Sequence, residues 1–267
     1  MIRDITIGQY YPADSPLHKL DPRTKLMGTL IFIISVFLFH TIPGYAVATL
    51  FLAALIKISK VPVKFIFKGL KAIFMILLIT MLFNVFLTPG EVIWKLGFLK
   101  MTKEGISLAV RMAIRLIYLV IGSSLMTLTT TPNQLTDGLE RSLRPLNRLH
   151  VPVHEISMMM SIALRFIPIL LEETDKIMKA QIARGADFEN GNLIQKVKNM
   201  VPLLVPLFIS AFRRANDLAM AMEARCYHGG EHRTQMKPLC YQKRDYVTYL
   251  ILAAYLAVAI TFRVVGI

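Results

Sequence analysis

Residues 25–41 read KLMGTLIFIISVFLFHT, an apolar stretch with no charged side chain after Lys25. A similar stretch follows directly, to about Ile58, and further apolar runs cover residues 66–88, 106–130 and 246–263. An α-helix needs roughly 17–25 mainly apolar residues to cross a bilayer. The sequence therefore predicts an all-α, polytopic membrane protein with about five transmembrane helices.

The composition supports a membrane protein and argues against a nucleic-acid-binding one. Of the 267 residues, 55% are hydrophobic, whereas soluble domains average about 45–50%. The net charge of +14 comes from Lys and Arg beside the apolar runs, as the positive-inside rule describes, and no basic groove interleaved with aromatic residues is visible. Cys226 and Cys240 are the only cysteines, so no disulfide framework is expected.

Turn signals and charge divide the chain into four regions. Asp21 before Pro22 is a helix-start signal, an Ile42-Pro43-Gly44 turn separates the first two apolar runs, and Pro89-Gly90 ends the third before a mixed loop at 91–104. The predicted regions are a cytoplasmic amino-terminal segment (1–24), transmembrane helices 1–4 (25–130), a cytoplasmic amphipathic-helix domain (131–245) and transmembrane helix 5 (246–267).

The lysines between residues 57 and 71 place that loop and the amino terminus in the cytoplasm. The 42–44 turn and the carboxyl terminus are then external, and the protein is a multi-pass protein of the cell membrane.

Two long amphipathic helices are predicted at 153–184 and 193–225, where apolar residues recur every three or four positions. Their apolar centres are shorter than a membrane span and charges crowd both ends, so we expect them to lie along the cytoplasmic membrane face. Pro168, Pro202 and Pro206 should kink them.

Each amphipathic helix ends in a small-Arg-small tripeptide: Ala183-Arg184-Gly185 in the first and Ala224-Arg225-Cys226 in the second. The simpler interpretation of either one alone is helix capping, because a cation near a helix carboxyl terminus is stabilised by the macrodipole. The repetition favours docking, since small neighbours allow close approach and arginine offers a planar fork for a carboxylate.

The leader Ser15-Pro16-Leu17-His18-Lys19-Leu20-Asp21-Pro22-Arg23-Thr24-Lys25 and the two tripeptides together resemble the T component of energy-coupling factor transporters. That component is the membrane-embedded coupling subunit of ATP-binding-cassette importers of vitamins and transition-metal ions. The resemblance extends over essentially the whole chain. Cys226 departs from the glycine of the family's coupling motif but leaves the arginine in place.

The resemblance implies that 131–245 is a coupling domain whose motifs dock on two cytoplasmic ATPase subunits, with Arg184 and Arg225 reaching acidic residues there. It also implies a membrane-embedded, substrate-binding S subunit that rests on the membrane part and the apolar side of the coupling helices. Packing in a core or against lipid explains that methionine-rich side equally well. The candidate contact residues are Met159, Met160, Ala163, Ile167, Leu204, Phe208 and Ala211.

We expect no catalysis, cofactor or metal on this chain, because it holds no Gly-x-x-x-x-Gly-Lys-Ser/Thr phosphate loop and ATP would be bound by the partner ATPases. His154-Glu155 begins like a zinc-protease helix, but Met158 stands where the second histidine is needed. A zinc site is disfavoured by irregular spacing among Cys226, His228, His232 and Cys240.

Three polar residues lie within the predicted spans. Arg111 and Arg115 should snorkel to the outer end of the fourth, and Asn84 should bond to a neighbouring helix. The rival functions are a membrane enzyme, for which no convergent polar constellation is visible, and a conventional permease that binds its own substrate, which would need a polar pathway.

Overall fold

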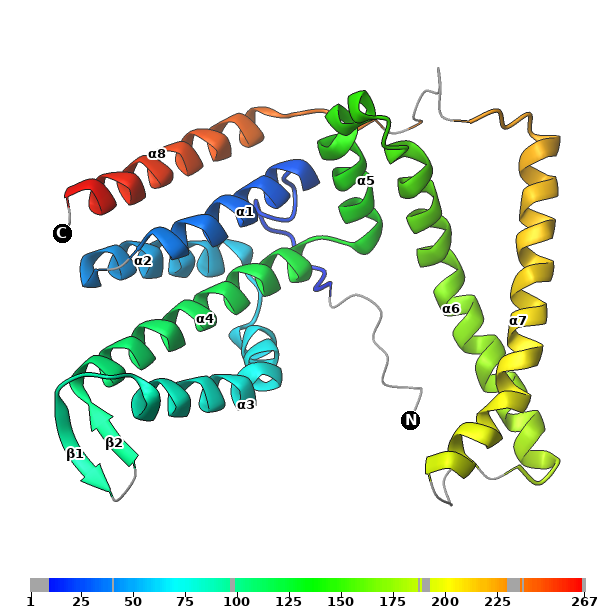
Figure 1. Cartoon of the computed structure of the whole chain (residues 1–267). Helices are drawn as coiled ribbons and strands as arrows, with labels where there is room; N and C mark the ends of the chain where they lie inside the picture. The colour runs from blue at the N-terminus through cyan, green and yellow to red at the C-terminus, as the bar shows by residue number, and fades with distance from the viewer. Residues whose placement is uncertain are drawn as a thin grey trace. The chain divides into compact units, whose positions relative to one another are not determined.

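The structure, a computed structural model, describes residues 10–39, 41–96, 99–186, 188, 193–229, 236 and 238–265 (Figure 1). The chain divides by contacts into a membrane unit, residues 8–141 and 239–267, and a helical-pair unit, residues 142–238. The elements are α1 (Pro22–Leu38), α2 (Ile42–Ser59), α3 (Val63–Leu87), β1 (Val92–Leu96), β2 (Leu99–Thr102), α4 (Lys103–Thr129), α5 (Pro132–Leu143), a 3₁₀ helix (Arg144–Leu149), α6 (Val153–Ala183), α7 (Leu193–Ala224) and α8 (Lys243–Val265).

The predicted class, a helical membrane protein, is confirmed by the length and composition of the helices. Among the described residues, three helices are long and apolar enough to cross a membrane, namely α4, α6 and α8. The bent helix α3, whose halves meet at 57°, makes a fourth if it counts as one span. Two of the five expected spans are short helices: α1 has only 17 residues, about 25 Å of helix, and the apolar helix of α2 covers only Pro43–Ser59.

Helix α6 differs from expectation in one respect. We placed both amphipathic helices on the cytoplasmic membrane face because their apolar centres looked too short, but α6 contains an 18-residue stretch apolar enough to span. Helix α7 does not meet the same criterion among the described residues. Both helices continue through their prolines, and α7 changes direction in its amino-terminal part (Figure 1).

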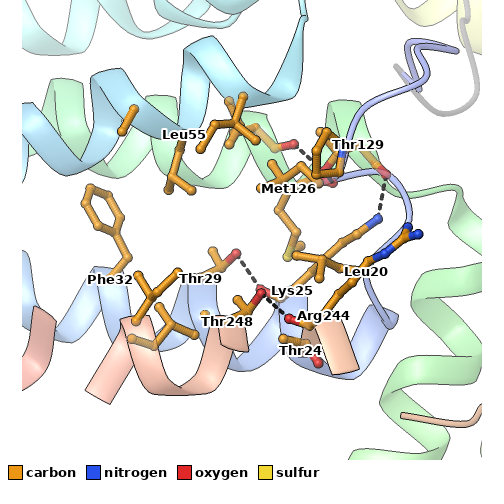
Figure 2. A pocket seen from close by; sticks show the side chains of 18 of the residues that line it. Leu20, Thr24, Lys25, Thr29, Phe32, Leu55, Met126, Thr129, Arg244 and Thr248 are labelled. Atoms are coloured by element: carbon orange, nitrogen blue, oxygen red, sulfur yellow. Dashed lines mark hydrogen bonds between the residues drawn. The ribbon is translucent and has the colours of Figure 1, made fainter. Parts of the chain in front are cut away.

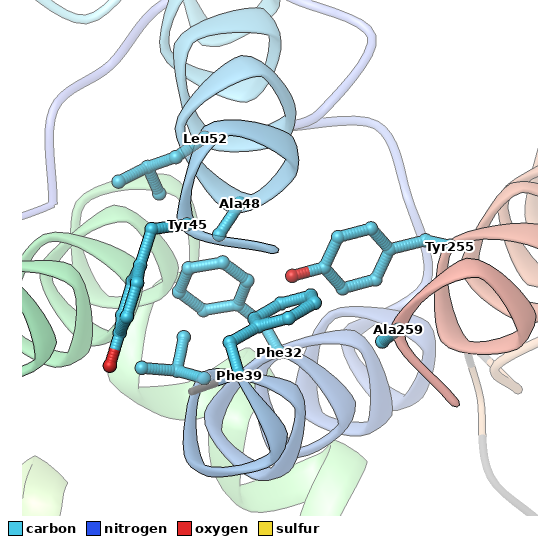
Figure 3. Packing of buried hydrophobic residues seen from close by; sticks show 8 residues of the cluster. Phe32, Phe39, Tyr45, Ala48, Leu52, Tyr255 and Ala259 are labelled. Carbon is cyan, nitrogen blue, oxygen red and sulfur yellow. The ribbon is translucent and has the colours of Figure 1, made fainter. Parts of the chain in front are cut away.

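An aromatic cluster holds the membrane unit together (Figure 3). The rings of Phe51 and Tyr255 stack with centroids 4.2 Å apart, and Phe32 stacks against both. The hydroxyls of Tyr255 and Ser35 lie 2.8 Å apart, so the buried hydroxyl of Tyr255 has a hydrogen-bond partner. Because these residues come from α1, α2 and α8, the cluster joins the first helices of the chain to the last.

Helix α5 packs on the start of α1 through Gly138. A Cβ atom at this glycine would lie only 2.8 Å from the Cβ atom of Pro22. Thr136 is also buried on this helix. The membrane unit therefore includes α5, and the helical-pair unit is narrower than the 131–245 region predicted from charge.

The segment that we expected to be a mixed loop is largely a β-hairpin, so that prediction is wrong. Strands β1 and β2 pair antiparallel, with Lys95 opposite Lys100 and a register irregularity between Val92 and Trp94. The hairpin leads directly into α4, whose amino terminus is capped by the Thr102 side chain.

One polar residue of the spans, Asn84, differs from expectation, whereas Arg115 lies beside the α1–α2 turn, on the side where we expected it. The Asn84 amide donates to the Thr80 carbonyl of its own helix at 2.7 Å, rather than to a neighbouring helix. Arg115 donates to the Phe39 carbonyl at 3.3 Å and so ties α4 to the α1–α2 turn, while Arg111 is exposed.

Candidate coupling site

The two amphipathic helices form an antiparallel pair within the helical-pair unit (Figure 1). Near the end of α6, the Gln181 amide donates to the Pro202 carbonyl, close to the start of α7, at 3.3 Å. Farther along, Arg214 and Glu173 form an ion pair of 2.7 Å. These two contacts pair later residues of α6 with earlier residues of α7, so the two helices run in opposite directions.

Both helices end in the same hydrogen-bonded cap. At the end of α6, the Gly185 amide donates to the Ile182 carbonyl and the Ala186 amide to the Gln181 carbonyl, at 2.9 and 3.0 Å. This combination is the Schellman motif, in which Gly185 takes the left-handed conformation with φ +87°. Arg184 is therefore the last residue before the turn, and its side chain projects from the helix tip.

The end of α7 repeats this cap in every bond. The amides of Cys226 and Tyr227 donate to the carbonyls of Glu223 and Met222, at 2.9 and 3.1 Å. Cys226 holds the left-handed position with φ +55°, although a side chain disfavours this conformation by about 1 kcal/mol or more. The substitution of cysteine for glycine therefore preserves the shape of the tip, and Arg225 occupies the position equivalent to Arg184.

Both arginine tips are exposed, together with their small neighbours Ala183, Gly185, Ala224 and Cys226. No carboxylate of the described residues pairs with either guanidinium. The antiparallel register sets the tips at opposite ends of the pair, separated by the stretch from Pro202 to Arg225, roughly 35 Å at 1.5 Å per residue. The capping interpretation is thus correct for the backbone, and among the described residues neither guanidinium is held by a carboxylate.

The candidate S-subunit residues lie mostly on the open surface of this pair. Phe208 is 61% exposed and Met159 is 58% exposed. Ala211 differs, because it is half-buried and lines a 310 Å³ cavity between the two helices. The remaining exposed candidates are Met160, Ala163, Ile167 and Leu204.

Sequence reasoning gave the leader a family resemblance and a helix-start signal at Asp21, but no contact with other helices, and the structure supplies such contacts. The Asp21 amide donates to the Asp245 carboxylate at 2.9 Å, which joins the start of α1 to the start of α8. The buried Lys25 ammonium donates to the carbonyls of His18 and Thr129, at 3.1 and 2.8 Å. The leader therefore fastens the ends of α1, α4 and α8 to one another.

Asp21 is the carboxylate of this leader network, and it pairs with Arg23. Burial raises the pKa of its carboxyl, but the hydrogen bonds from the Arg23 side chain and amide outweigh burial and hold the pKa below its ordinary value. The Arg23 guanidinium meets the Asp21 carboxylate at 2.8 Å and also lies 3.9 Å from the ring centroid of Tyr241. Asp21 is thus ionised at neutral pH, and Arg23 neutralises it locally.

The disfavoured zinc site falls partly outside the described residues, since His232 belongs to the part that is not described. Cys226 and Cys240 are exposed. No group of three or more metal-ligating side chains comes together among the residues that the structure does describe.

The helices and paired tips define a class of protein, a polytopic helical membrane protein with two exposed cationic helix ends. Residues 13–236 match the family described as CbiQ, cobalt transport protein, and the chain belongs to this family. It is 54% identical over 266 residues to a Clostridium kluyveri protein named energy-coupling factor transporter transmembrane protein EcfT, covering 99% of this chain and 98% of that protein.

Two further relatives carry the same name. The Ruminiclostridium cellulolyticum protein is 56% identical over 264 residues, with 96% of this chain and 99% of the relative covered. The Bacillus subtilis protein is 48% identical over 260 residues, with 96% and 98% covered. These similarities confirm the family membership that the leader and the tripeptides predicted.

Proposed function

We propose that this chain is the transmembrane coupling subunit of an energy-coupling factor importer. In this role it transmits ATP-driven motion of two cytoplasmic ATPase subunits to a membrane-embedded S subunit that binds the substrate. The chain itself contributes no catalysis and no nucleotide site. The transported compound, a vitamin or a transition-metal ion, would be selected by the S subunit.

The observation that carries this proposal is the pair of identical caps at opposite ends of two antiparallel helices. An antiparallel pair with the same tip at each end has a local pseudo-two-fold axis across its middle. Two equivalent tips suit a partner that also comes as two similar subunits arranged about an axis. Exposed arginines suit such docking, because a guanidinium makes paired, charge-assisted hydrogen bonds to a carboxylate.

The exposed apolar surface of the α6–α7 pair is consistent with binding of the second proposed partner, the membrane-embedded S subunit. A monomeric soluble protein seldom exposes a large contiguous apolar patch, whereas these helices expose Met159, Leu204 and Phe208. Lipid or a hydrophobic subunit would cover such side chains. Methionine adapts its shape easily, which suits a surface that accepts an S subunit.

Purification from its own cells in mild detergent tests the proposal. We expect two ATPase subunits and a small hydrophobic subunit to elute with the chain, and their mass ratio gives the stoichiometry. If the chain elutes alone and retains a transported solute, it acts as a permease and the proposed role is wrong.

A further inference from the structure

We propose that the membrane unit holds an anionic phospholipid in a cavity between α1, α2, α4 and α8. The cavity has a volume of about 530 Å³, within the roughly 300–1,000 Å³ of ordinary ligand pockets. It lies entirely within the membrane unit and does not involve the arginine tips. The proposal therefore stands independently of the coupling function.

The walls of the cavity accept hydrocarbon rather than a polar solute (Figure 2). Apolar side chains supply most of the lining, with leucine the most frequent. The hydroxyls of Thr29, Thr129 and Thr248 donate to carbonyls of their own helices, at 2.8, 2.8 and 2.9 Å. Their hydrogens are therefore already used. Thr24 also lines the cavity, and its hydroxyl is the one lining threonine hydroxyl without a hydrogen-bond partner among the described residues. The walls therefore offer few polar groups to a sugar, a vitamin or a hydrated ion.

One end of the cavity is closed by aromatic rings. Phe32 and Phe51 line it, and behind them Tyr255 stacks on Phe51. Figure 2 shows Phe32 at the end opposite Lys25 and Arg244. The terminal methyl groups of an acyl chain would rest against these rings.

The other end is cationic. Lys25, Lys243 and Arg244 line the cavity there, because the bond between the Asp21 amide and the Asp245 carboxylate holds the starts of α1 and α8 together. Both nearby carboxylates are engaged: Asp21 by Arg23, and Asp245 by the amides of Asp21 and Gln242. Among the described residues, no acidic side chain pairs with Lys243 or Arg244.

A cavity with one apolar end and one cationic end suits an amphiphile, whose hydrocarbon chain would occupy the apolar end and whose anionic headgroup would meet the cations. Ile58, Val247 and Ile251 line the cavity and are exposed, so its apolar mouth opens at α2 and α8 toward the bilayer. The positive-inside pattern assigns the cationic end to the cytoplasmic leaflet, which carries anionic lipids, and basic pockets between membrane helices on that side bind their headgroups.

The test uses the full chain, purified in mild detergent and transferred to phosphatidylcholine nanodiscs with increasing phosphatidylglycerol. Native mass spectrometry then measures the lipid that each chain retains. We expect phosphatidylglycerol to be retained at least tenfold better than phosphatidylcholine. In Lys243→Gln/Arg244→Gln that affinity should fall about 25-fold, since each cation near a bilayer surface contributes about fivefold. The matched control, Lys64→Gln/Lys71→Gln, removes two exposed cations outside the cavity and should retain the lipid.

A second variant tests the hydrocarbon part without altering charge. Ala54 lines the cavity, and Ala54→Phe should obstruct the acyl-chain space and abolish retention of phosphatidylglycerol, while Ala54→Leu should weaken that retention. Monodisperse elution of each variant confirms that it folds.

Three results would overturn the proposal. One is equal retention by the Lys243/Arg244 and control variants. Another is displacement of the lipid by free glycerol phosphate, which would indicate a simple anion site. The third is a crosslink from Ala54→Cys to a protein subunit in a chain that retains no lipid.

Discussion

The membrane unit and the helical-pair unit differ in where their apolar side chains lie: the first buries them in a core, and the second leaves many of them exposed. The membrane unit buries aromatic side chains between α1, α2 and α8 and fastens its helix ends through the leader. In the helical-pair unit, Val153 is the one buried hydrophobic residue among those described. An ion pair and a glutamine contact cross between α6 and α7, and many large apolar side chains, such as those of Met159 and Phe208, stay exposed.

This difference indicates that the membrane unit determines the folding stability of the protein and that the helical-pair unit determines its association with partners. A domain with its own buried core can fold alone, whereas two amphipathic helices that leave their apolar faces uncovered need lipid or protein against them. Substitutions in the membrane unit should therefore alter unfolding, and those in the helical-pair unit should alter association.

Asp245→Ala should give the largest loss of stability, about 3 kcal/mol. The carboxylate is 2% exposed and accepts the amides of Asp21 and Gln242; hydrogen bonds to a charged group contribute about 1.5–3 kcal/mol each. Thermal unfolding of the full chain in detergent measures the effect. The control is Asp217→Ala at an exposed position of α7, and equal melting temperatures for the two variants would refute the fastening role of Asp245.

The two caps should respond to substitution with opposite signs. Gly185→Ala adds a side chain at φ +87° and should weaken the cap of α6 by about 1 kcal/mol. Cys226→Gly removes a side chain at φ +55° and should strengthen the cap of α7 by a similar amount. Hydrogen exchange at the amides of Ala186 and Tyr227, which close the caps, reports each change. Effects of the same sign would show that the two tips are not equivalent.

Arg214→Met should have the smallest effect on unfolding, at most about 1 kcal/mol. The Arg214 side chain is 39% exposed, so water weakens its ion pair with Glu173. A melting shift as large as that of Asp245→Ala would mean that the helical-pair unit has a stabilising core after all. The charge swap Glu173→Arg/Arg214→Glu should restore the wild-type value.

Local signals predicted the helices well. Asp21 caps α1 as expected, with its carboxylate accepting the Arg23 amide, and α3 ends at Leu87 just before the Pro89-Gly90 signal. The Ile42-Pro43-Gly44 turn was misplaced, because proline in the first turn of a helix is also favourable and α2 begins at Ile42. The β-hairpin was missed although Gly97 separates two short apolar runs, since three lysines obscured the alternation.

The two arginine tips of the candidate site could be predicted from the sequence, but the packing of the helices that carry them could not. The tripeptides identify both helix ends, and Gly185 has the conformation that glycine at this position implies. The antiparallel register depends on Glu173 meeting Arg214, 41 positions away, and charge alone does not select that pair among many. Asp21 and Asp245 are 224 positions apart, so the network around the leader required the structure.

We propose that the ATPases hold this chain at two points, Arg184 and Arg225. The affinity of the ATPase pair for the Arg184→Ala/Arg225→Ala variant, measured in nanodiscs beside uptake in cells, tests this role. Losing one partner of a desolvated charge pair costs about 2–5 kcal/mol, so each single variant should weaken binding at least 30-fold and the double variant further still. Arg148→Ala/Lys198→Ala removes two other exposed cations of the same unit and should bind normally. Wild-type affinity and uptake in the double arginine variant would contradict the claim.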